Sequence, residues 1–213
     1  MNPFPTKEEL SAALAARCTK QLQGKLQSSV IAVCGLGGLG SNIAVCLARA
    51  GIGKLILIDF DRVDISNLHR QQYKASQIGM YKTEALAANL LEISPYLNLT
   101  LHPAQIQKEN ISLLLSDADI ICEAFDRAEM KAMLVNGVLE DLPDAYLIAA
   151  SGMAGLGSGN EIKTKKISDH FYLCGDGKSD VADTPGLLSS RVMLCAAHQA
   201  HMALRVLAGQ FDC

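Results

Sequence analysis

The sequence predicts an α/β fold, with a Rossmann-like, doubly wound and mainly parallel sheet and a short antiparallel C-terminal extension. Short runs of branched apolar residues alternate with helical patterns as far as residue 151, which favours parallel strands joined by right-handed crossovers. A glycine-rich turn separates the first apolar run from the helix that follows it. Of the 213 residues, 49% are hydrophobic but only 5% are aromatic, so the core must consist of aliphatic side chains packed between layers.

The elements are expected in a regular order within one domain that spans 1–213. Leu and Cys residues at four-residue intervals predict an N-terminal helix over 7–24. An α/β core over 28–151 follows, in which 61–79 is polar and irregular. The expected strands are 30–34, 54–59, 97–102, 118–125 and 145–151, and the expected helices are 41–50, 82–93, 110–115 and 127–140.

The pattern changes in the C-terminal part, 152–213. Four glycines fall within 152–160, and 161–167 alternates as a half-exposed strand does. Residues 174–186 contain Gly, Asp and Pro and are expected to form a loop. A final helix rich in Ala, Leu and Val is expected at about 187–208.

Composition and charge exclude several classes of protein. The net charge of −3 and the lack of a Lys/Arg run argue against nucleic acid as the main partner. The 23 uncharged residues between Lys25 and Arg49 are long enough for a membrane helix, but their glycine cluster would break it, so no membrane partner is expected. The seven cysteines include no Cys-x-x-Cys pair, which argues against disulfides and zinc. The N-terminus does not resemble a secretory signal, and a cytoplasmic location is expected.

The glycine-rich turn predicts a nucleotide site. Gly35, Gly37 and Gly40 form Gly-x-Gly-x-x-Gly, with Gly38 inside the motif, between an expected strand and an expected helix. The first glycine permits a tight turn, the second lets the backbone approach a phosphate, and the third lets the helix pack on the strand. Asp59 ends the second strand, where an acid binds ribose hydroxyls.

The loop after Asp59 favours ATP over a dinucleotide. Its sequence, DFDRVDISNLHRQ, contains Asp61, Asn67 and Arg70, and Lys82 follows in GMYK. A triphosphate needs fixed cations, whereas the pyrophosphate of NAD rests on the glycine loop. We therefore expect Arg70 and Lys82 to bind the phosphates and the departing pyrophosphate.

Asp126 ends the fourth expected strand in CEAFD, at the same edge of the sheet as the glycine turn. A carboxylate at this edge is well placed to hold Mg²⁺. It can also cap the helix that follows, and the two roles are compatible.

Together these stretches resemble the adenylating enzymes that activate ubiquitin-like sulfur carriers. GLGGLGS, DFDRVDISNLHRQ, the lysine of GMYK and the aspartate of EAFD are similar to motifs of the ThiF, MoeB and HesA relatives of ubiquitin-activating enzymes. The short length and the stretches GMYKTEA, SGMAG and HFYLCGD resemble most closely the shorter ThiF branch (family 2), which is linked to thiamine synthesis. The resemblance covers roughly residues 17–209.

The resemblance implies a reaction and a division of roles. ATP would adenylate the C-terminal glycine carboxylate of a ThiS-like carrier, which ends in Gly-Gly, and the extension at 152–213 would bind this carrier. Asp59 would bind ribose, Asn67 and Arg70 the phosphates, and Lys82 would stabilise charge at the α-phosphate. Asp126 would hold Mg²⁺. In relatives an arginine of the N-terminal helix reaches the partner subunit's site, so the resemblance implies a homodimer in which Arg17 does this.

The sequence departs from this family in its cysteines. Longer relatives carry two Cys-x-x-Cys pairs for structural zinc, and none is present here, so zinc is not expected. Some relatives bond covalently to the carrier through a cysteine in a crossover loop, and Cys174 lies in a comparable region. An isolated cysteine is more often a buried apolar residue, and adenylation does not need this bond.

The glycines of 152–160 are expected to form the groove for the carrier's extended tail.

Several alternatives stay open from the sequence. The same chemistry can act on a molybdopterin-type or cysteine-synthesis-type carrier, because these carriers share the tail. A related enzyme can act on a carboxylate borne by tRNA. A third possibility is an NAD-dependent oxidoreductase with the same glycine motif, and a fourth is a non-catalytic scaffold that binds nucleotide.

Overall fold

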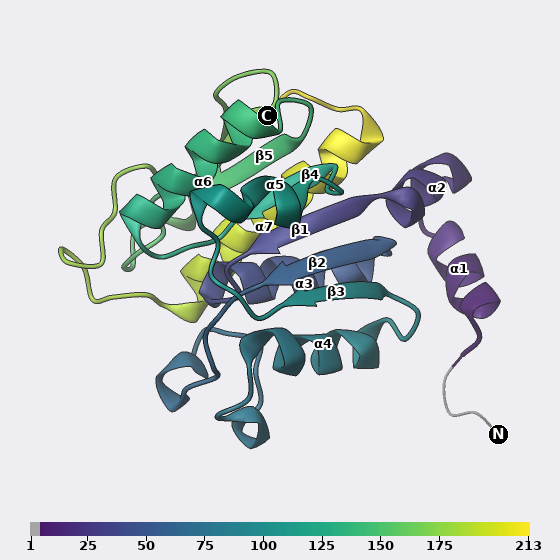
Figure 1. Ribbon diagram of the computed structural model, residues 1–213, viewed down its shortest axis with the longest axis horizontal. Helices are drawn as coiled ribbons and strands as arrows, with labels where there is room; N and C mark the ends of the chain where they lie inside the picture. The colour runs from purple at the N-terminus through teal and green to yellow at the C-terminus, as the bar shows by residue number, and fades with distance from the viewer. Residues whose placement is uncertain (1–4) are drawn as a thin grey trace.

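The computed structural model describes residues 5–213, which form a seven-stranded sheet between two layers of helices (Figure 1). The strand order is β3-β2-β1-β4-β5-β7-β6, and only the β6–β7 pair is antiparallel. The strands are β1 Val30–Cys34, β2 Lys54–Ile58, β3 Asn98–His102, β4 Ile120–Glu123, β5 Tyr146–Ala150, β6 Lys163–Lys166 and β7 Phe171–Gly175. The helices are α1 Lys7–Ala15, α2 Lys20–Ser28, α3 Gly38–Ala50, α4 Lys82–Ile93, α5 Ile111–Leu115, α6 Ala128–Asp141 and α7 Ser189–Ala208. The predicted fold class is confirmed.

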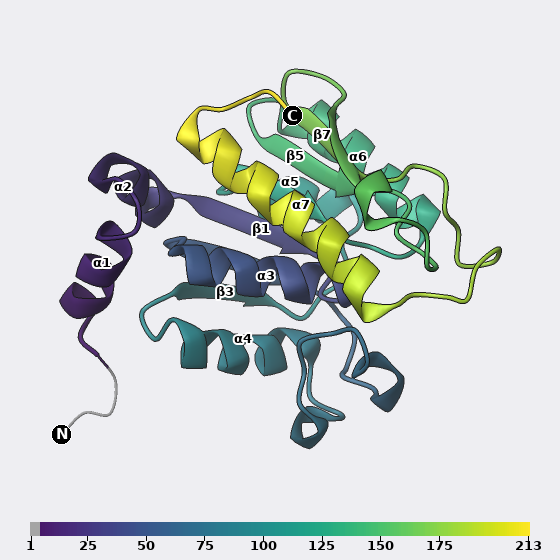
Figure 2. The same ribbon diagram turned by 180° about the vertical axis from the view of Figure 1, so that it is seen from behind.

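The helices cover the two faces of the sheet unequally. Helices α5 and α6 lie on one face, and α3, α4 and α7 lie on the other, as Figures 1 and 2 show. Continuous apolar runs such as VIAVC in β1 are explained by this arrangement, because a parallel strand with both faces covered has no polar side. Ile31 and Val33 pack toward α3 and α7, and Ala32 and Cys34 pack toward α5 and α6.

The order of the strands reverses between β1 and β4. From β1 the chain winds outward through β2 to β3, and it then crosses back to place β4 on the other side of β1. Ligands of open α/β sheets bind in the crevice outside the carboxyl ends of the strands at such a reversal. The topology therefore predicts a ligand site at the carboxyl ends of β1 and β4.

The C-terminal extension contains one more strand than the sequence indicated. Strand β6 is the half-exposed strand expected at 161–167, whereas β7 was not predicted and overlaps the expected loop at 174–186 only in its last two residues. Strand β7 lies parallel to β5 and antiparallel to β6, so it joins the extension to the main sheet. Its sequence, FYLCG, is short and is followed by Gly, Asp and Lys, which hid it, although Tyr172 and Cys174 are fully buried.

The single N-terminal helix expected over 7–24 is wrong, because two helices, α1 and α2, occupy this region. The apolar spacing continues through the break, but the Thr19 hydroxyl accepts a hydrogen bond from the amide of Leu22 and starts a new helix. Both helices lie at the amino ends of the strands, where the amide of Gly53 donates to Leu26. No helix among residues 5–213 combines the length and apolar character that crossing a bilayer requires.

Candidate functional site

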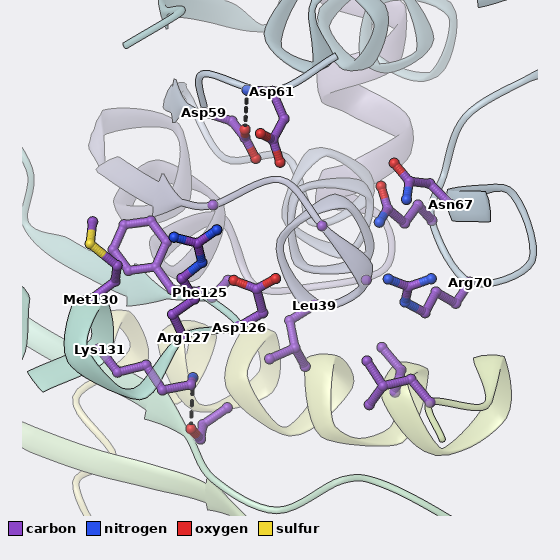
Figure 3. Close-up of a pocket in the computed structure, with 18 of the residues that line it drawn as sticks. Leu39, Asp59, Asp61, Asn67, Arg70, Phe125, Asp126, Arg127, Met130 and Lys131 are labelled. Carbon is purple, nitrogen blue, oxygen red and sulfur yellow. Dashed lines mark hydrogen bonds between the residues drawn. The ribbon is translucent and has the colours of Figure 1, made fainter. Parts of the chain in front are cut away.

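A pocket of about 800 Å³ opens at the carboxyl ends of β1, β2, β4 and β5. The sequence-predicted residues that line it are Gly35, Gly37, Gly38, Asp59, Asp61, Asn67, Arg70, Lys82 and Asp126. Figure 3 shows Phe125 and Asp126 on one side of the glycine loop and Asn67 and Arg70 on the other. The reversal of strand order and the sequence motifs thus lead to the same place in the fold.

The glycine loop folds as its three motif positions require. Gly35 has a φ of +90° and its amide donates to the carbonyl of Ile58, so the chain turns sharply out of β1. Helix α3 begins at Gly38, and its N-terminal amides face the pocket, which favours a bound anion. Gly40 lies outside the pocket, where a Cβ would stand only 1.8 Å from the carbonyl oxygen of Gly35. The third glycine therefore serves helix–strand packing.

Asp59 is oriented by the backbone. Its Oδ2 accepts the amide of Leu36 at 2.6 Å, and its Oδ1 accepts the amide of Asp61 at 2.7 Å. A carboxylate offers about four lone pairs, so both oxygens can still accept ribose hydroxyls. Burial raises the pKa of Asp59, and Lys82 and the two amides oppose that rise.

Lys82 lies at the start of α4 with its side chain only 7% exposed. Its Nζ is 2.7 Å from Oδ2 of Asp61 and 3.9 Å from Oδ2 of Asp59. The side chain of Asp61 is half exposed, so the ammonium group stands at the boundary between the carboxylates and the pocket. The pocket thereby has a fixed cation on the β2 side.

Arg70 provides the second cation, beside the start of α3. The aliphatic part of its side chain lies against Gly38, and its Nη1 donates to the carbonyl of Ser66 at 3.2 Å. The buried Nε of Arg70 and Oε1 of the neighbouring Gln71 have no hydrogen-bond partner in the described part of the chain. Unpaired buried polar atoms are costly, and those beside a pocket are candidates for ligand contacts. Gln71 was not assigned a role from the sequence, although it follows Arg70 directly.

Asp126 lies in the turn between β4 and α6. Its carboxylate is exposed to the pocket and makes no hydrogen bond or ion pair with a side chain of residues 5–213. The turn is fixed from below by buried Glu123, which accepts the amide of Phe125 at 2.7 Å. Lys131 donates to both oxygens of Glu123 at 3.0 Å, and burial raises the pKa of Glu123 against the effect of Lys131. This buried pair was not predicted from the sequence.

The wall beyond β5 is made mostly of small residues, with Met153 as the largest. It consists of 151–154, which follow β5, and of 179–181, which lie in the long loop before α7. Of the glycine segment predicted to form a groove, 152–160, only the first part reaches the pocket. Residues 156–160 are exposed outside the pocket.

Besides Gly40, two predicted residues lie away from the pocket. Arg17 is exposed between α1 and α2, at the amino ends of the strands and hence opposite the site of its own chain. Cys174 is fully buried in β7, and burial raises the pKa of its thiol to about 12. A nucleophilic cysteine needs access and an accessible thiolate, so these surroundings do not fit the covalent role expected of Cys174.

The ThiF family profile matches residues 10–212. The molybdopterin-synthase adenylyltransferase of Haemophilus influenzae is 35% identical over 113 residues, which are 53% of this chain and 46% of that protein. The adenylyltransferase and sulfurtransferase MOCS3 of Drosophila virilis is 37% identical over 53% of this chain and 25% of its own length. The alignments therefore span less than half the length of these relatives.

Solved structures extend the likeness over almost the whole fold. The Escherichia coli tRNA N6-threonylcarbamoyladenosine dehydratase TcdA, in complex with ATP, superposes with a TM-score of 0.85 at 20% identity and covers 95% of both chains. Escherichia coli MccB with ATP gives a TM-score of 0.71 at 21% identity, over 90% of this chain and 59% of that one. At these identities the likeness concerns the fold. The sequence match over nearly the full length, with the glycine loop and its partners gathered in one pocket, shows that this chain belongs to the ThiF family.

Proposed function

We propose that this protein is an ATP-dependent adenylyltransferase that activates the C-terminal glycine carboxylate of a ThiS-like sulfur carrier for thiazole and thiamine biosynthesis in the cytoplasm. One observation carries the proposal: a single pocket combines a glycine loop, the cations Arg70 and Lys82, and the free carboxylate of Asp126. A dinucleotide site needs no such set of charges beyond its glycine loop. Relatives that are named adenylyltransferases support the reaction class.

The proposed step needs positioning and charge neutralisation rather than a general base. A carboxylate oxygen of the carrier attacks the α-phosphorus of ATP, the bond to the β-phosphate breaks, and pyrophosphate leaves with the electron pair. No proton moves, because the carboxylate is already ionised. Arg70 and the amides of α3 hold the phosphates, Lys82 stabilises the charge that develops at the α-phosphate, and Asp59 fixes the ribose.

Magnesium fits the residues on the pocket. Asp126 offers an exposed carboxylate without a protein partner, and Mg²⁺ is usually held by one or two carboxylates together with substrate phosphates. The absence of any group of three or more potential ligands among residues 5–213 is compatible with that arrangement. When bound, Mg²⁺ would neutralise charge on the phosphates.

A homodimer would give Arg17 a role, because this residue cannot serve the site of its own chain. We propose that Arg17 enters the site of a second copy. The test mixes Arg17→Ala with Asp126→Ala, each inactive alone. In a mixed dimer, one site has its own Asp126 and receives Arg17 from the other chain, so activity should return on mixing. If the mixture stays inactive while both variants fold and dimerise, the cross-subunit role is wrong.

The proposed activity is tested by ATP–pyrophosphate exchange with a panel of purified carriers of the thiamine, molybdopterin and cysteine-synthesis types. Exchange should require one carrier, and removal of its terminal glycine should abolish it. The TcdA-like fold favours, as a second candidate, a carboxylate borne by tRNA, so exchange with tRNA is run in parallel. Binding of NAD(H) with no exchange under any condition would contradict adenylation. If the protein binds nucleotide but substitution of Arg70 or Lys82 leaves the measured exchange rate unchanged, the protein is a scaffold and not the enzyme.

A further inference from the structure

A buried ion pair outside the nucleotide motifs joins α7 to the loop after β7. Nη2 of Arg191 lies 2.6 Å from Oδ2 of Asp176, and the two side chains are only 5% and 1% exposed. Burial acts to raise the pKa of Asp176, but hydrogen bonds from Ser179, Lys178 and Arg191 outweigh it and hold that pKa well below its usual range. The Asp176 carboxylate is therefore ionised at neutral pH.

The pair holds together two segments that are distant in the sequence. Nη1 of Arg191 donates to the carbonyls of Gly157 and Ser158, so the arginine fixes the outer part of the glycine segment. Oδ1 of Asp176 accepts the amides of Lys178 and Ser179 at 2.9 and 2.8 Å, which shapes the loop after β7.

Direct bonds between these segments continue the connection into the pocket wall. The amide of Asp176 donates to Gly152 at 2.9 Å, and the amide of Ala154 donates to the hydroxyl of Ser179 at 3.0 Å. Gly152 has a φ of +78°, and a Cβ on it would stand 2.1 Å from Oδ1 of Asp176. The wall of 151–154 and 179–181 is thus built around Asp176.

The same turn of α7 touches the glycine loop. A methyl group of Val192, the residue after Arg191, packs against Gly38. One helical turn therefore sets the distance between the wall and the phosphate-binding end of α3. The wall is held through Arg191, whereas the glycine loop is contacted by Val192, so a change at Arg191 can displace the wall while the Val192 contact remains.

The wall has the character expected for an extended chain rather than for a nucleotide. None of the cations that line the pocket belongs to the wall, whose only charged residue is Asp180, and three of the four residues of 151–154 are small and uncharged. Extended peptide chains are recognised through main-chain groups of the protein, and small side chains allow that approach. Replacing a buried ion pair by apolar residues of similar volume often leaves stability unchanged or raises it, so stability alone does not explain why this pair is present.

We propose that Arg191 and Asp176 are positioning residues that hold the wall of 151–154 and 179–181 in register with the glycine loop, so that the carrier's C-terminal tail meets the α-phosphate. The inference rests on the proposed adenylation of a carrier. It assigns the pair to the carrier half of the site and not to the ATP half.

The test compares Arg191→Lys and Asp176→Asn with the wild-type enzyme in pyrophosphate exchange, using the carrier that the wild type adenylates. Lysine keeps the charge but has one ammonium group in place of the guanidinium fork, so it cannot reach Asp176 and both carbonyls together. Asparagine keeps an oxygen for the two amides of the loop but loses the charge. The matched control is Arg205→Lys, on the far end of α7, where Arg205 pairs with exposed Asp212 at 2.6 Å.

The KM for the carrier is expected to rise by about tenfold or more in both variants, because a displacement of about 1 Å in a reacting group already causes a large loss of activity. The KM and the Kd for ATP should stay within about twofold, which a merely structural defect would not achieve. Equal rises in both KM values, or no change relative to Arg205→Lys, would overturn the positioning role alone. Failure of the wild type with every carrier would overturn the proposed function, and this role with it. If Arg191→Lys does not fold, Asp176→Asn decides by the same criteria.

Discussion

Replacing Gly40 by alanine tests whether close contact between α3 and the glycine loop builds the phosphate site. A Cβ at this position would stand 1.8 Å from the carbonyl oxygen of Gly35 and 3.1 Å from a methyl of Val33. Real side chains do not approach backbone closer than 3.0 Å, so α3 and the loop must separate by roughly 1 Å. Overpacking of this kind costs about 1–3 kcal/mol.

The consequences are measured in two assays. In thermal unfolding, each kcal/mol corresponds to about 2–4 °C for a domain of this size, so the Tm of Gly40→Ala should fall by several degrees. Because the amides at the start of α3 move with the helix, ATP-dependent exchange should fall about a hundredfold. The loss of activity should therefore exceed what the fraction of unfolded protein explains.

Gly24→Ala is the matched control. Gly24 lies inside α2, and a Cβ there would meet nothing within 4 Å. Alanine is a better helix former than glycine by up to about 1 kcal/mol, so this variant should be as stable as the wild type or more so, with unchanged exchange. If Gly40→Ala behaves like Gly24→Ala in both assays, the assignment of the third glycine to helix packing is refuted.

Three further predictions follow from the site and its surroundings. Lys82→Met should lower exchange by at least about a hundredfold, because it removes a preorganised cation. Its control, Lys74→Met, breaks only an exposed ion pair with Glu92. This control should change the free energy of unfolding by less than about 1 kcal/mol and leave exchange intact. Alkylation of the native protein between pH 7 and 9, followed by peptide mass spectrometry, should label exposed Cys46 and leave Cys174 unmodified. The reason is that Cys174 is buried and its thiol stays protonated below about pH 12. Rapid labelling of Cys174 would support the covalent role again. The pKa of the Asp176 carboxylate is lowered in the folded state, so this group contributes stability above its ordinary pKa of 3.8, and this stability is lost as the pH falls below it. The difference in unfolding free energy between the wild type and Asp176→Asn should therefore shrink in acid. A difference that does not depend on pH would contradict the charged pair.

The core of the fold and the nucleotide half of the site were predictable because local signals and topology agree there. Strand, glycine turn, helix and acid occur in chain order, and the parallel sheet brings their ends together by its geometry. Asp59, Arg70 and Asp126 therefore reach one pocket, as expected from their places after strands. ThiF membership followed from the same motifs.

The remaining features depend on contacts that no local pattern encodes. A short strand such as β7 is defined by its partners, and its Gly-Asp continuation looks like loop. The break before α2 depends on one hydroxyl, Thr19, within an uninterrupted apolar spacing. The pairs Glu123–Lys131 and Asp176–Arg191 join residues whose charge types are common on surfaces, and only the fold reveals that they are buried. The burial of Cys174 is likewise a property of its strand in the sheet.

We propose that this protein forms an acyl-adenylate on a carrier's terminal glycine. The most direct measurement is the intact mass of each purified carrier after incubation with the enzyme, ATP and Mg²⁺ and denaturation of the mixture. One carrier is expected to gain the mass of a single adenylyl group, and this gain should need the carrier's terminal glycine and disappear with Lys82→Met. If no carrier gains this mass while the enzyme is folded and binds ATP, the proposed formation of an acyl-adenylate is contradicted.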